Sequence, residues 1–136
     1  MNDGPIIIAD DDIDDKDFLQ EAWEELNYDN ELIFFSKVEE VMEYMASGKK
    51  TPFIILSDVN LGGKTGFELK EKLLHSSSNY ASIPFIYWSS GMSLTQIEKA
   101  YDLGANGFFI KDNNLLALKQ TLIDIVKYWK KCIVPR

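Results

Sequence analysis

The sequence predicts an α/β fold in which a doubly wound, five-stranded parallel sheet is covered by five helices. Two observations lead to this prediction. Short apolar runs rich in Ile and Phe alternate five times with segments whose apolar residues recur at helical spacing. Parallel strands joined by helices take right-handed crossovers, which place helices on both faces of one sheet. A chain of 136 residues is long enough for one such core, so we expect residues 1–136 to form a single domain.

The expected strands are residues 6–9, 31–35, 53–56, 83–88 and 107–110. Each run is short and bounded by turn residues, which is typical of strands buried on both faces. Pro84 stands near the start of the fourth run, where a missing N–H is tolerated. A Gly-rich loop over residues 61–66 follows the third run.

The segments between these runs are the expected helices. The first is predicted over residues 15–27, the second ends at Ser47 and Gly48, and the fourth ends at Gly104. Either of two adjacent asparagines, at 113 and 114, can cap the fifth helix. The apolar stripes contain Phe18, Ala22, Trp23 and Leu26; Val38, Val41, Met42 and Met45; Phe67, Leu69, Leu73 and Leu74; Leu94, Ile97, Ala100 and Tyr101; and Leu118, Leu122, Ile125, Val126 and Trp129.

Composition excludes several classes of partner. Lys and Arg total 14 against 22 Asp and Glu, and the net charge of −8 repels nucleic acid phosphates. No apolar run approaches the roughly 20 residues that span a bilayer, and the first five residues lack the pattern of a signal peptide. Cys132 is the only cysteine, which rules out an internal disulfide. We therefore expect a cytoplasmic protein that binds neither nucleic acid nor membrane.

Four of the expected strands end on residues that can handle phosphate or a metal ion. In an open parallel sheet, ligand sites lie beyond the carboxyl ends of the strands, so these residues should share one pocket. They are Asp10, Asp11 and Asp12 after the first strand, Asp58 after the third, Ser89 after the fourth and Lys111 after the fifth.

The residue types in this pocket point to phosphoryl chemistry. Carboxylates held close together repel one another unless a cation neutralises them, and an oxygen-rich site suits Mg²⁺. A carboxylate such as Asp58 can attack phosphorus and carry a covalent acyl phosphate. The ammonium of Lys111 and the hydroxyl of Ser89 could then stabilise the charge on the transferred group.

The order of these residues resembles the receiver domain of two-component response regulators, a CheY-like domain with a flavodoxin-like fold. The resemblance covers nearly the whole chain and includes Gly66, eight residues after Asp58, and the run Leu-Gly-Ala-Asn-Gly at 103–107. It implies a stand-alone receiver that a histidine kinase or histidine phosphotransfer protein phosphorylates on Asp58. Phosphorylation would switch a surface that binds a downstream protein target, and slow autodephosphorylation would reset it.

The resemblance also implies how the pocket holds Mg²⁺. Asp11 would bind the ion directly, Asp10 would assist through water, and Asp58 would complete the set of carboxylates. Asn60 would offer its backbone carbonyl.

For the phosphoryl group, the resemblance implies that Ser89 and Lys111 hold its oxygens. Phe108 matches the switch aromatic, which turns inward as Ser89 moves toward the phosphoryl group. The family usually has a proline after this lysine, with a cis peptide, where this chain has Asp112. The sequence leaves the conformation of the Lys111–Asp112 peptide open.

Two alternatives to a phosphorylated receiver remain. Asp10-x-Asp12 resembles the opening motif of Mg²⁺-dependent phosphohydrolases of the haloacid dehalogenase type, although only Asp112 represents their closing acidic pair. The second alternative is a degenerate receiver that binds partners without phosphorylation, which the missing proline motivates.

Residues 128–136 are predicted to be the end of the last helix and an apolar tail, with no output domain after it. The tail is similar to that of the small receivers that partner bacterial phytochromes, several of which dimerise. We therefore expect a homodimer through the fourth and fifth helices and this tail. The alternative is a tail that folds back onto its own domain.

Overall fold

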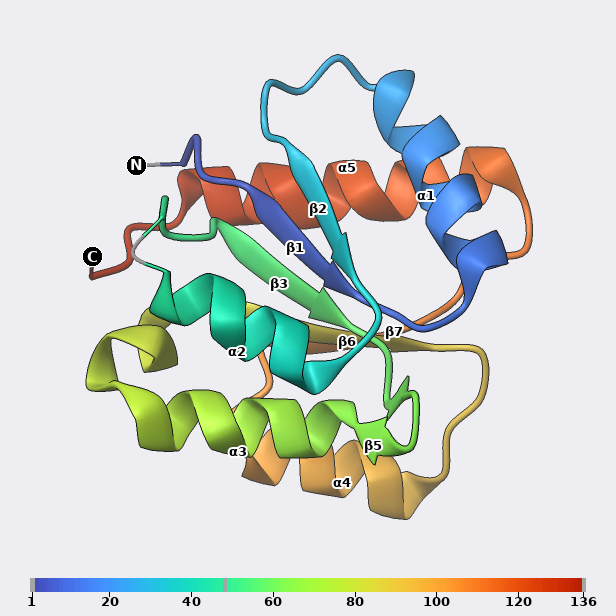
Figure 1. The fold of residues 1–136 in the computed structure, drawn as a ribbon. Helices are drawn as coiled ribbons and strands as arrows, with labels where there is room; N and C mark the ends of the chain where they lie inside the picture. The colour runs from blue at the N-terminus through green and yellow to red at the C-terminus, as the bar shows by residue number, and fades with distance from the viewer. Residues whose placement is uncertain (1, 48, 136) are drawn as a thin grey trace.

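The computed structural model describes residues 2–47 and 49–135, and their main sheet has the strand order β2-β1-β3-β6-β7, with every neighbouring pair parallel. Figure 1 shows the sheet between two layers of helices. This architecture confirms the predicted fold class. The strands are β1 Ile6–Ala9, β2 Leu32–Phe35, β3 Ile54–Ser57, β6 Phe85–Ser89 and β7 Gly107–Ile110.

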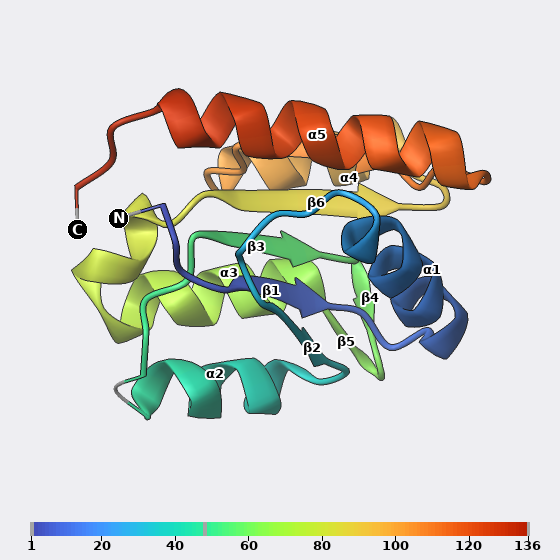
Figure 2. The same ribbon diagram turned by 90° about the horizontal axis from the view of Figure 1, so that it is seen from above.

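Five helices cover the two faces of the sheet. The helices α1 and α5 pack on one face and α2, α3 and α4 on the other, and Figure 2 shows strands between α5 at the top and α2 at the bottom. The helices are α1 Ile13–Glu24, α2 Val38–Ala46, α3 Gly66–Ser76, α4 Leu94–Asp102 and α5 Leu115–Lys131, with a short 3₁₀ turn, η1, at Ser78–Ser82. No helix in the described part of the chain is both long and apolar enough to cross a membrane.

Alternating residues of the buried strands belong to two apolar cores, one on each face of the sheet. Along β1, Ile6 and Ile8 pack under α1 and α5, whereas Ile7 and Ala9 pack under the helices of the opposite face. The side chains of these four β1 residues are at most 5% exposed, so this strand is shielded from water on both faces. The sheet is therefore a rigid support for the residues that follow its strands.

The first helix differs from its predicted range of 15–27. It begins at Ile13 because the side chain of Asp12 accepts a hydrogen bond of 2.9 Å from the backbone N–H of Asp14, which caps the helix. It ends at Glu24, and Asn27 then takes a left-handed conformation with φ of 58°. The cap places residue 15 in the first turn of the helix.

Three other boundaries also depend on local hydrogen bonds. Asn114 is the cap of α5, since its side chain accepts from the N–H of Ala117 at 2.8 Å. The fourth strand begins at Phe85 rather than residue 83, because the N–H of Ile83 closes η1. The helix α2 ends at Ala46, and the predicted stop at Gly48 lies outside the described residues.

The Gly-rich loop after β3 forms a small antiparallel hairpin of β4 (Asn60–Leu61) and β5 (Lys64–Thr65). Gly62 and Gly63 make its turn with positive φ of 50° and 90°, a region that favours glycine. The hairpin lies beside the carboxyl end of β3, next to the loop after β1.

Candidate functional site: a carboxylate pocket at the sheet edge

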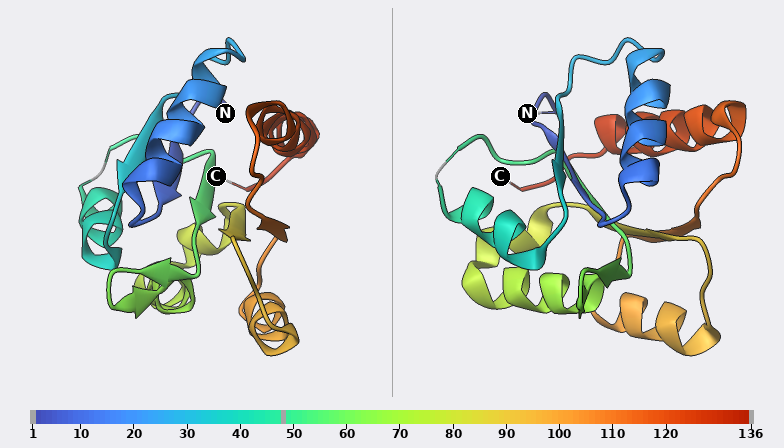
Figure 3. Two further views of the ribbon diagram at one scale, coloured as in Figure 1. Left: turned by 90° about the vertical axis from the view of Figure 1, so that its right-hand side faces the viewer. Right: turned by 45° about the vertical axis from the view of Figure 1, so that its right-hand side comes forward.

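The ammonium of Lys111 lies among three carboxylates at the carboxyl edge of the sheet. Its Nζ is 2.8 Å from Oδ2 of Asp58, 2.5 Å from Oδ2 of Asp15 and 3.1 Å from Oδ2 of Asp10. Figure 3 (left) is viewed from the side of the molecule toward which β1 and β3 run, and α1 and α5 lie on one side of the sheet there. Segments up to 101 residues apart in the chain thus meet in one pocket.

Backbone hydrogen bonds continue the sheet ladder into the pocket and fix these residues. The N–H of Asp10 donates to the carbonyl of Phe35 (3.0 Å), and that of Asp58 donates to the carbonyl of Ala9 (2.8 Å). The N–H of Lys111 likewise donates to Ser89 (2.8 Å). Each functional residue therefore sits one step beyond a paired strand.

Asp10 is the most deeply buried of the three carboxylates, with a side chain that is 1% exposed. Its Oδ1 accepts a hydrogen bond of 2.9 Å from the N–H of Asp12, but its Oδ2 is buried without a hydrogen-bond partner among the described residues. The contact of Oδ2 with Lys111 is thus a charge contact rather than a well-aligned hydrogen bond. Burial raises the pKa of Asp10 to about 6, although the hydrogen bond from Asp12 and the Lys111 charge oppose this.

Lys111 remains protonated in this setting. Burial by itself would lower its pKa, but hydrogen bonds to Asp15 and Asp58 and the charge of Asp10 outweigh burial and raise the pKa above its usual value. The ammonium also lies 5.2 Å from the ring centroid of Trp88, a buried residue of β6.

The other predicted site residues have different partners. Oδ2 of Asp11 accepts a hydrogen bond of 2.9 Å from the N–H of Gly62, and Asp11 is exposed. The buried hydroxyl of Ser89 donates to the carbonyl of Gly91 at 2.8 Å. The N–H of Asn60 lies 3.3 Å from Oδ1 of Asp58. The structure thus unites Asp10, Asp58 and Lys111, whereas Asp11 is bonded to the hairpin turn and Ser89 to a residue of its own loop.

Asp15 belongs to this pocket although its position in the sequence did not suggest it. It lies on α1, whereas the predicted pocket residues all follow strands. The sequence feature that could have indicated Asp15 is the capping aspartate. With Asp12 as N-cap, Asp15 is the third residue of the helix. Helical side chains point toward the N-terminus of their helix, so this carboxylate reaches back toward the pocket.

The pocket has the donor set of a magnesium site. Carboxylate oxygens of Asp10, Asp15 and Asp58 lie within 4.8 Å of one another. All are hard oxygen donors, which Mg²⁺ prefers. The buried Oδ2 of Asp10 makes no hydrogen bond in the described chain, only the charge contact with Lys111, so it has a lone pair available for a metal ion.

Phe108 lies on β7 and packs against the apolar core under α2, α3 and α4. Its ring is half-buried and stacks on Tyr87 of β6, with ring centroids 5.6 Å apart. The peptide between Lys111 and Asp112 is trans, as are all peptide bonds in the described residues. The side chain of Asp112 accepts a hydrogen bond of 2.7 Å from Thr121 on α5.

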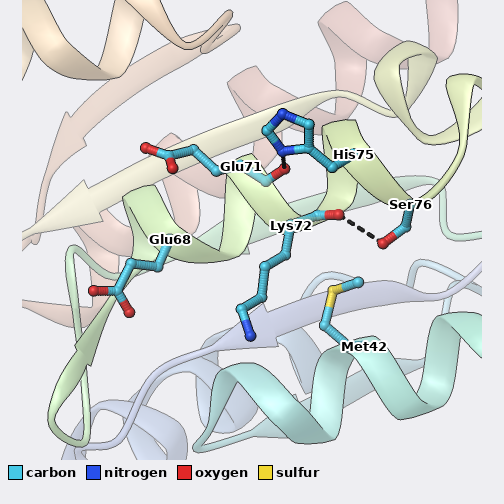
Figure 4. Close-up of a pocket in the computed structure, with 6 residues that line it drawn as sticks. All are labelled: Met42, Glu68, Glu71, Lys72, His75 and Ser76. Carbon is cyan, nitrogen blue, oxygen red and sulfur yellow. Dashed lines mark hydrogen bonds between the residues drawn. The ribbon is translucent and has the colours of Figure 1, made fainter.

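A second depression, of about 530 Å³, lies between α2 and α3, away from the pocket. Figure 4 shows that its polar side chains interact along their own helix: Nδ1 of His75 lies 2.8 Å from the carbonyl of Glu71, and Ser76 donates to the carbonyl of Lys72. Met42 forms the apolar side. These groups do not converge on one point, so this depression is not the candidate site.

A doubly wound fold whose sheet edge carries clustered aspartates and one lysine suits phosphate chemistry. Residues 6–123 match the family model of the response regulator receiver domain, and the chain belongs to that family. Receiver domains are signalling domains of two-component systems, and they bind Mg²⁺ at an acidic aspartate cluster.

Curated relatives and solved structures agree with this assignment. The two-component response regulator ARR5 of Arabidopsis thaliana is 31% identical over 74 residues, which cover 54% of this chain and 40% of ARR5. The phosphorylated cyanobacterial phytochrome response regulator RcpA is 27% identical, with a TM-score of 0.84 over 97% of this chain and 98% of its own. A response regulator in red light signaling of R. palustris, 21% identical, shares the fold, with a TM-score of 0.86 over 98% of this chain and 99% of its own.

Proposed function

We propose that this receiver domain is a phosphorylation switch in which Asp58 accepts a phosphoryl group from a histidine kinase or a histidine phosphotransfer protein. The observation that carries the proposal is the 2.8 Å contact between Asp58 and the ammonium of Lys111, inside a pocket that holds further carboxylates. The carboxylate is the nucleophile, and the ammonium offsets the charge that the phosphoryl oxygens bring.

The transfer forms one bond and breaks one. A carboxylate oxygen of Asp58 attacks the phosphorus of a phosphohistidine, and the P–N bond breaks with its electron pair left on the imidazole. Lys111 lies where it can donate to a phosphoryl oxygen, since its Nζ already contacts Asp58. Ser89, whose hydroxyl now donates to Gly91, would turn to the phosphoryl group.

Mg²⁺ would be held by Asp10, Asp11 and Asp58 and by the backbone carbonyl of Asn60. When bound, the ion neutralises the carboxylates and the phosphoryl oxygens that would otherwise repel one another. The unsatisfied Oδ2 of Asp10 supports this assignment. So does the Mn²⁺-bound form of the response regulator Rcp1, a structure 24% identical with a TM-score of 0.79 over 96% of this chain and 98% of its own.

The output of the switch would be a change in the surface formed by α4, β7 and α5. Phe108 stacks on Tyr87, and Tyr87 lies two residues before Ser89 on the same strand. A movement of Ser89 toward the pocket would therefore alter the packing of Phe108. Large apolar side chains are exposed on this surface for a downstream protein, namely Tyr101, Ile110 and Tyr128.

The phosphodonor would dock at the edge of the sheet that carries the pocket. The first turns of α1 and α5 begin just after the pocket loops, and each exposes one large aliphatic side chain. Ile13 on α1 is 71% exposed, and Leu116 on α5 is 76% exposed. Apolar side chains beside an acidic pocket suit a partner helix that presents a phosphohistidine among apolar residues.

The experiment is phosphorylation with acetyl phosphate, followed by intact-mass spectrometry. We expect one added phosphate with Mg²⁺, none in EDTA, and none in Asp58→Asn. Equal labelling in EDTA would contradict the role of the metal. Turnover of a generic phosphomonoester would instead support the phosphohydrolase, and failure to bind both Mg²⁺ and beryllofluoride would support the degenerate receiver.

A further inference from the structure

The ammonium of Lys111 has as many carboxylate neighbours as it has N–H donors. A lysine ammonium carries three N–H donors and no acceptor. Here Nζ hydrogen-bonds Asp15 and Asp58 and contacts Asp10. A phosphoryl group on Asp58 would occupy one of that carboxylate's own oxygens and attract the same ammonium, so the phosphoryl oxygens would compete with Asp15 and Asp10 for it.

Two of the three carboxylates are held in place, and one of these, Asp58, is the residue that would carry the phosphoryl group. The side chains of Asp10 and Asp58 are only 1% and 9% exposed, and water cannot replace the ammonium as a partner at little cost. Each also accepts a backbone N–H through its other oxygen, from Asp12 and Asn60 respectively. Their orientation is therefore set by the loops that carry them.

Asp15 is the partner that can exchange. Its side chain is 24% exposed, the most of the three, and it lies on the first turn of α1 at the mouth of the pocket. A rotation about its side-chain bonds would move the carboxylate into water. Yet its contact with Nζ is both an ion pair and a hydrogen bond, so it holds Lys111 in the unphosphorylated protein.

Electrostatic repulsion between Asp15 and a phosphoryl group on Asp58 also favours the exchange. The carboxylate oxygens of Asp15 and Asp58 come within 4.8 Å of each other. A phosphoryl group on Asp58 adds negative charge beside Asp15, and like charges at this distance repel. Phosphorylation thus repels the carboxylate of Asp15. It also gives the ammonium of Lys111 a more highly charged partner.

We propose that Asp15 is a positioning residue that holds Lys111 in the unphosphorylated state and competes with the phosphoryl group for its ammonium. The proposal rests on the function proposed above. Asp15 sets how readily the phosphorylated state forms: it restrains the lysine until a phosphoryl group displaces it. Its oxygen lies within 4.8 Å of those of Asp10 and Asp58, but the metal ligands proposed above are Asp10, Asp11, Asp58 and the carbonyl of Asn60, so the proposal assigns Asp15 to Lys111 and not to the metal ion.

The test measures beryllofluoride affinity in saturating Mg²⁺ and, separately, Mg²⁺ affinity alone. We expect Asp15→Asn to bind beryllofluoride about fivefold more tightly than the wild type, the effect of one partly exposed ion pair. Its Mg²⁺ affinity should be unchanged or higher. The matched control is Asp14→Asn, which removes the same charge from the same helical turn at an exposed position and should change beryllofluoride affinity less than twofold.

A double-mutant cycle with Lys111→Ala shows whether Asp15 acts through the lysine. In the Lys111→Ala background, we expect Asp15→Asn to improve beryllofluoride affinity less than twofold. An equal gain in both backgrounds would overturn the proposal, because Asp15 would then act by charge alone. Weaker Mg²⁺ binding by Asp15→Asn would overturn it too, since Asp15 would be a metal ligand.

The result for the wild type separates this proposal from the one on which it rests. A wild-type protein that takes up no beryllofluoride in Mg²⁺ would contradict the phosphorylation switch and the competition together. A wild-type protein that binds it, with an Asp15→Asn variant that binds it no better, would contradict the competition alone.

Discussion

Thr121 donates a hydrogen bond of 2.7 Å from Oγ1 to Oδ2 of Asp112, which ties the residue after Lys111 to the first half of α5. The family usually has proline at the position of Asp112. Here a side-chain hydrogen bond tethers this residue to α5, and the backbone that presents Lys111 is anchored on both sides, by Ser89 and by Thr121.

Removing this anchor should loosen Lys111. We expect Thr121→Val to lower the free energy of unfolding by about 1 kcal/mol, the usual contribution of one hydrogen bond, and to weaken beryllofluoride binding. Thr121→Ser keeps the hydroxyl and should keep the affinity. Urea denaturation and a beryllofluoride titration check both values, and a Thr121→Val variant with wild-type affinity would show that the bond does not position Lys111.

Asp10 should make stability depend on pH in the absence of Mg²⁺. Burial raises its pKa in the folded protein to about 6, whereas the ordinary value of 3.8 applies to the unfolded chain. Between these values the folded state binds more protons than the unfolded state, so this group's contribution to the free energy of unfolding rises as the pH falls toward 4 and is lowest above 6. Asp10→Asn should remove that dependence and stabilise the protein by roughly 1–3 kcal/mol at neutral pH.

Urea denaturation in EDTA at neutral and mildly acidic pH measures this effect. The control is Asp14→Asn, an exposed aspartate close in sequence, which should keep the wild-type pH profile. If Asp10→Asn were less stable than the wild type at neutral pH, the charge contact with Lys111 would outweigh the cost of burying the carboxylate.

Trp88 should report on the state of the pocket. The ammonium of Lys111 lies 5.2 Å from its ring centroid, so any movement of that charge alters the field at a buried indole. We expect Mg²⁺ or beryllofluoride to change the tryptophan fluorescence and Trp88→Phe to abolish the change. Trp129→Phe, at the far end of α5, is the control that should preserve it. A response that survives in Trp88→Phe would contradict this assignment.

The structure suggests where to shorten the chain in order to test the dimer that was predicted from the tail. The helix α5 continues to Lys131, and Ser82 donates a hydrogen bond of 2.8 Å to the carbonyl of Pro135, yet Ile133 is 92% exposed. A chain that ends at Lys131 therefore removes the exposed tail but keeps the helix. We expect light scattering to show a dimer for the intact chain and a monomer for the shortened one. If the intact chain is monomeric at tens of micromolar, with and without beryllofluoride, the predicted homodimer is wrong.

The fold and the centre of the pocket could be predicted because both follow from strand periodicity. Buried parallel strands read as apolar runs, and the topology sends their carboxyl ends to one edge, which is why Asp10, Asp58 and Lys111 meet. The cap of α5 could be predicted only in part, since Asn113 and Asn114 offered the same side-chain chemistry and only the backbone decides which one caps.

The surroundings of the pocket could not be predicted, because they depend on loop geometry and helix phase. Asp15 enters the pocket only because Asp12 caps the helix. A helix predicted to begin at residue 15 does not place the side chain of Asp15 in the first turn after that cap. The bond from Gly62 to Asp11 depends on a positive φ in the hairpin turn. The roles of Asp11, Ser89, Asn60 and Phe108 in the phosphorylated state stay predictions.

The most direct test of the central claim is the location of the phosphoryl group. Acyl phosphates are reduced by borohydride, which would convert a phosphorylated aspartate to homoserine at its position in the chain. After treatment with acetyl phosphate and Mg²⁺, peptide mapping should find homoserine at position 58 and at no other aspartate, and none in EDTA. Homoserine at Asp10 or Asp11 instead, or none with Mg²⁺ present, would contradict Asp58 as the phosphoacceptor.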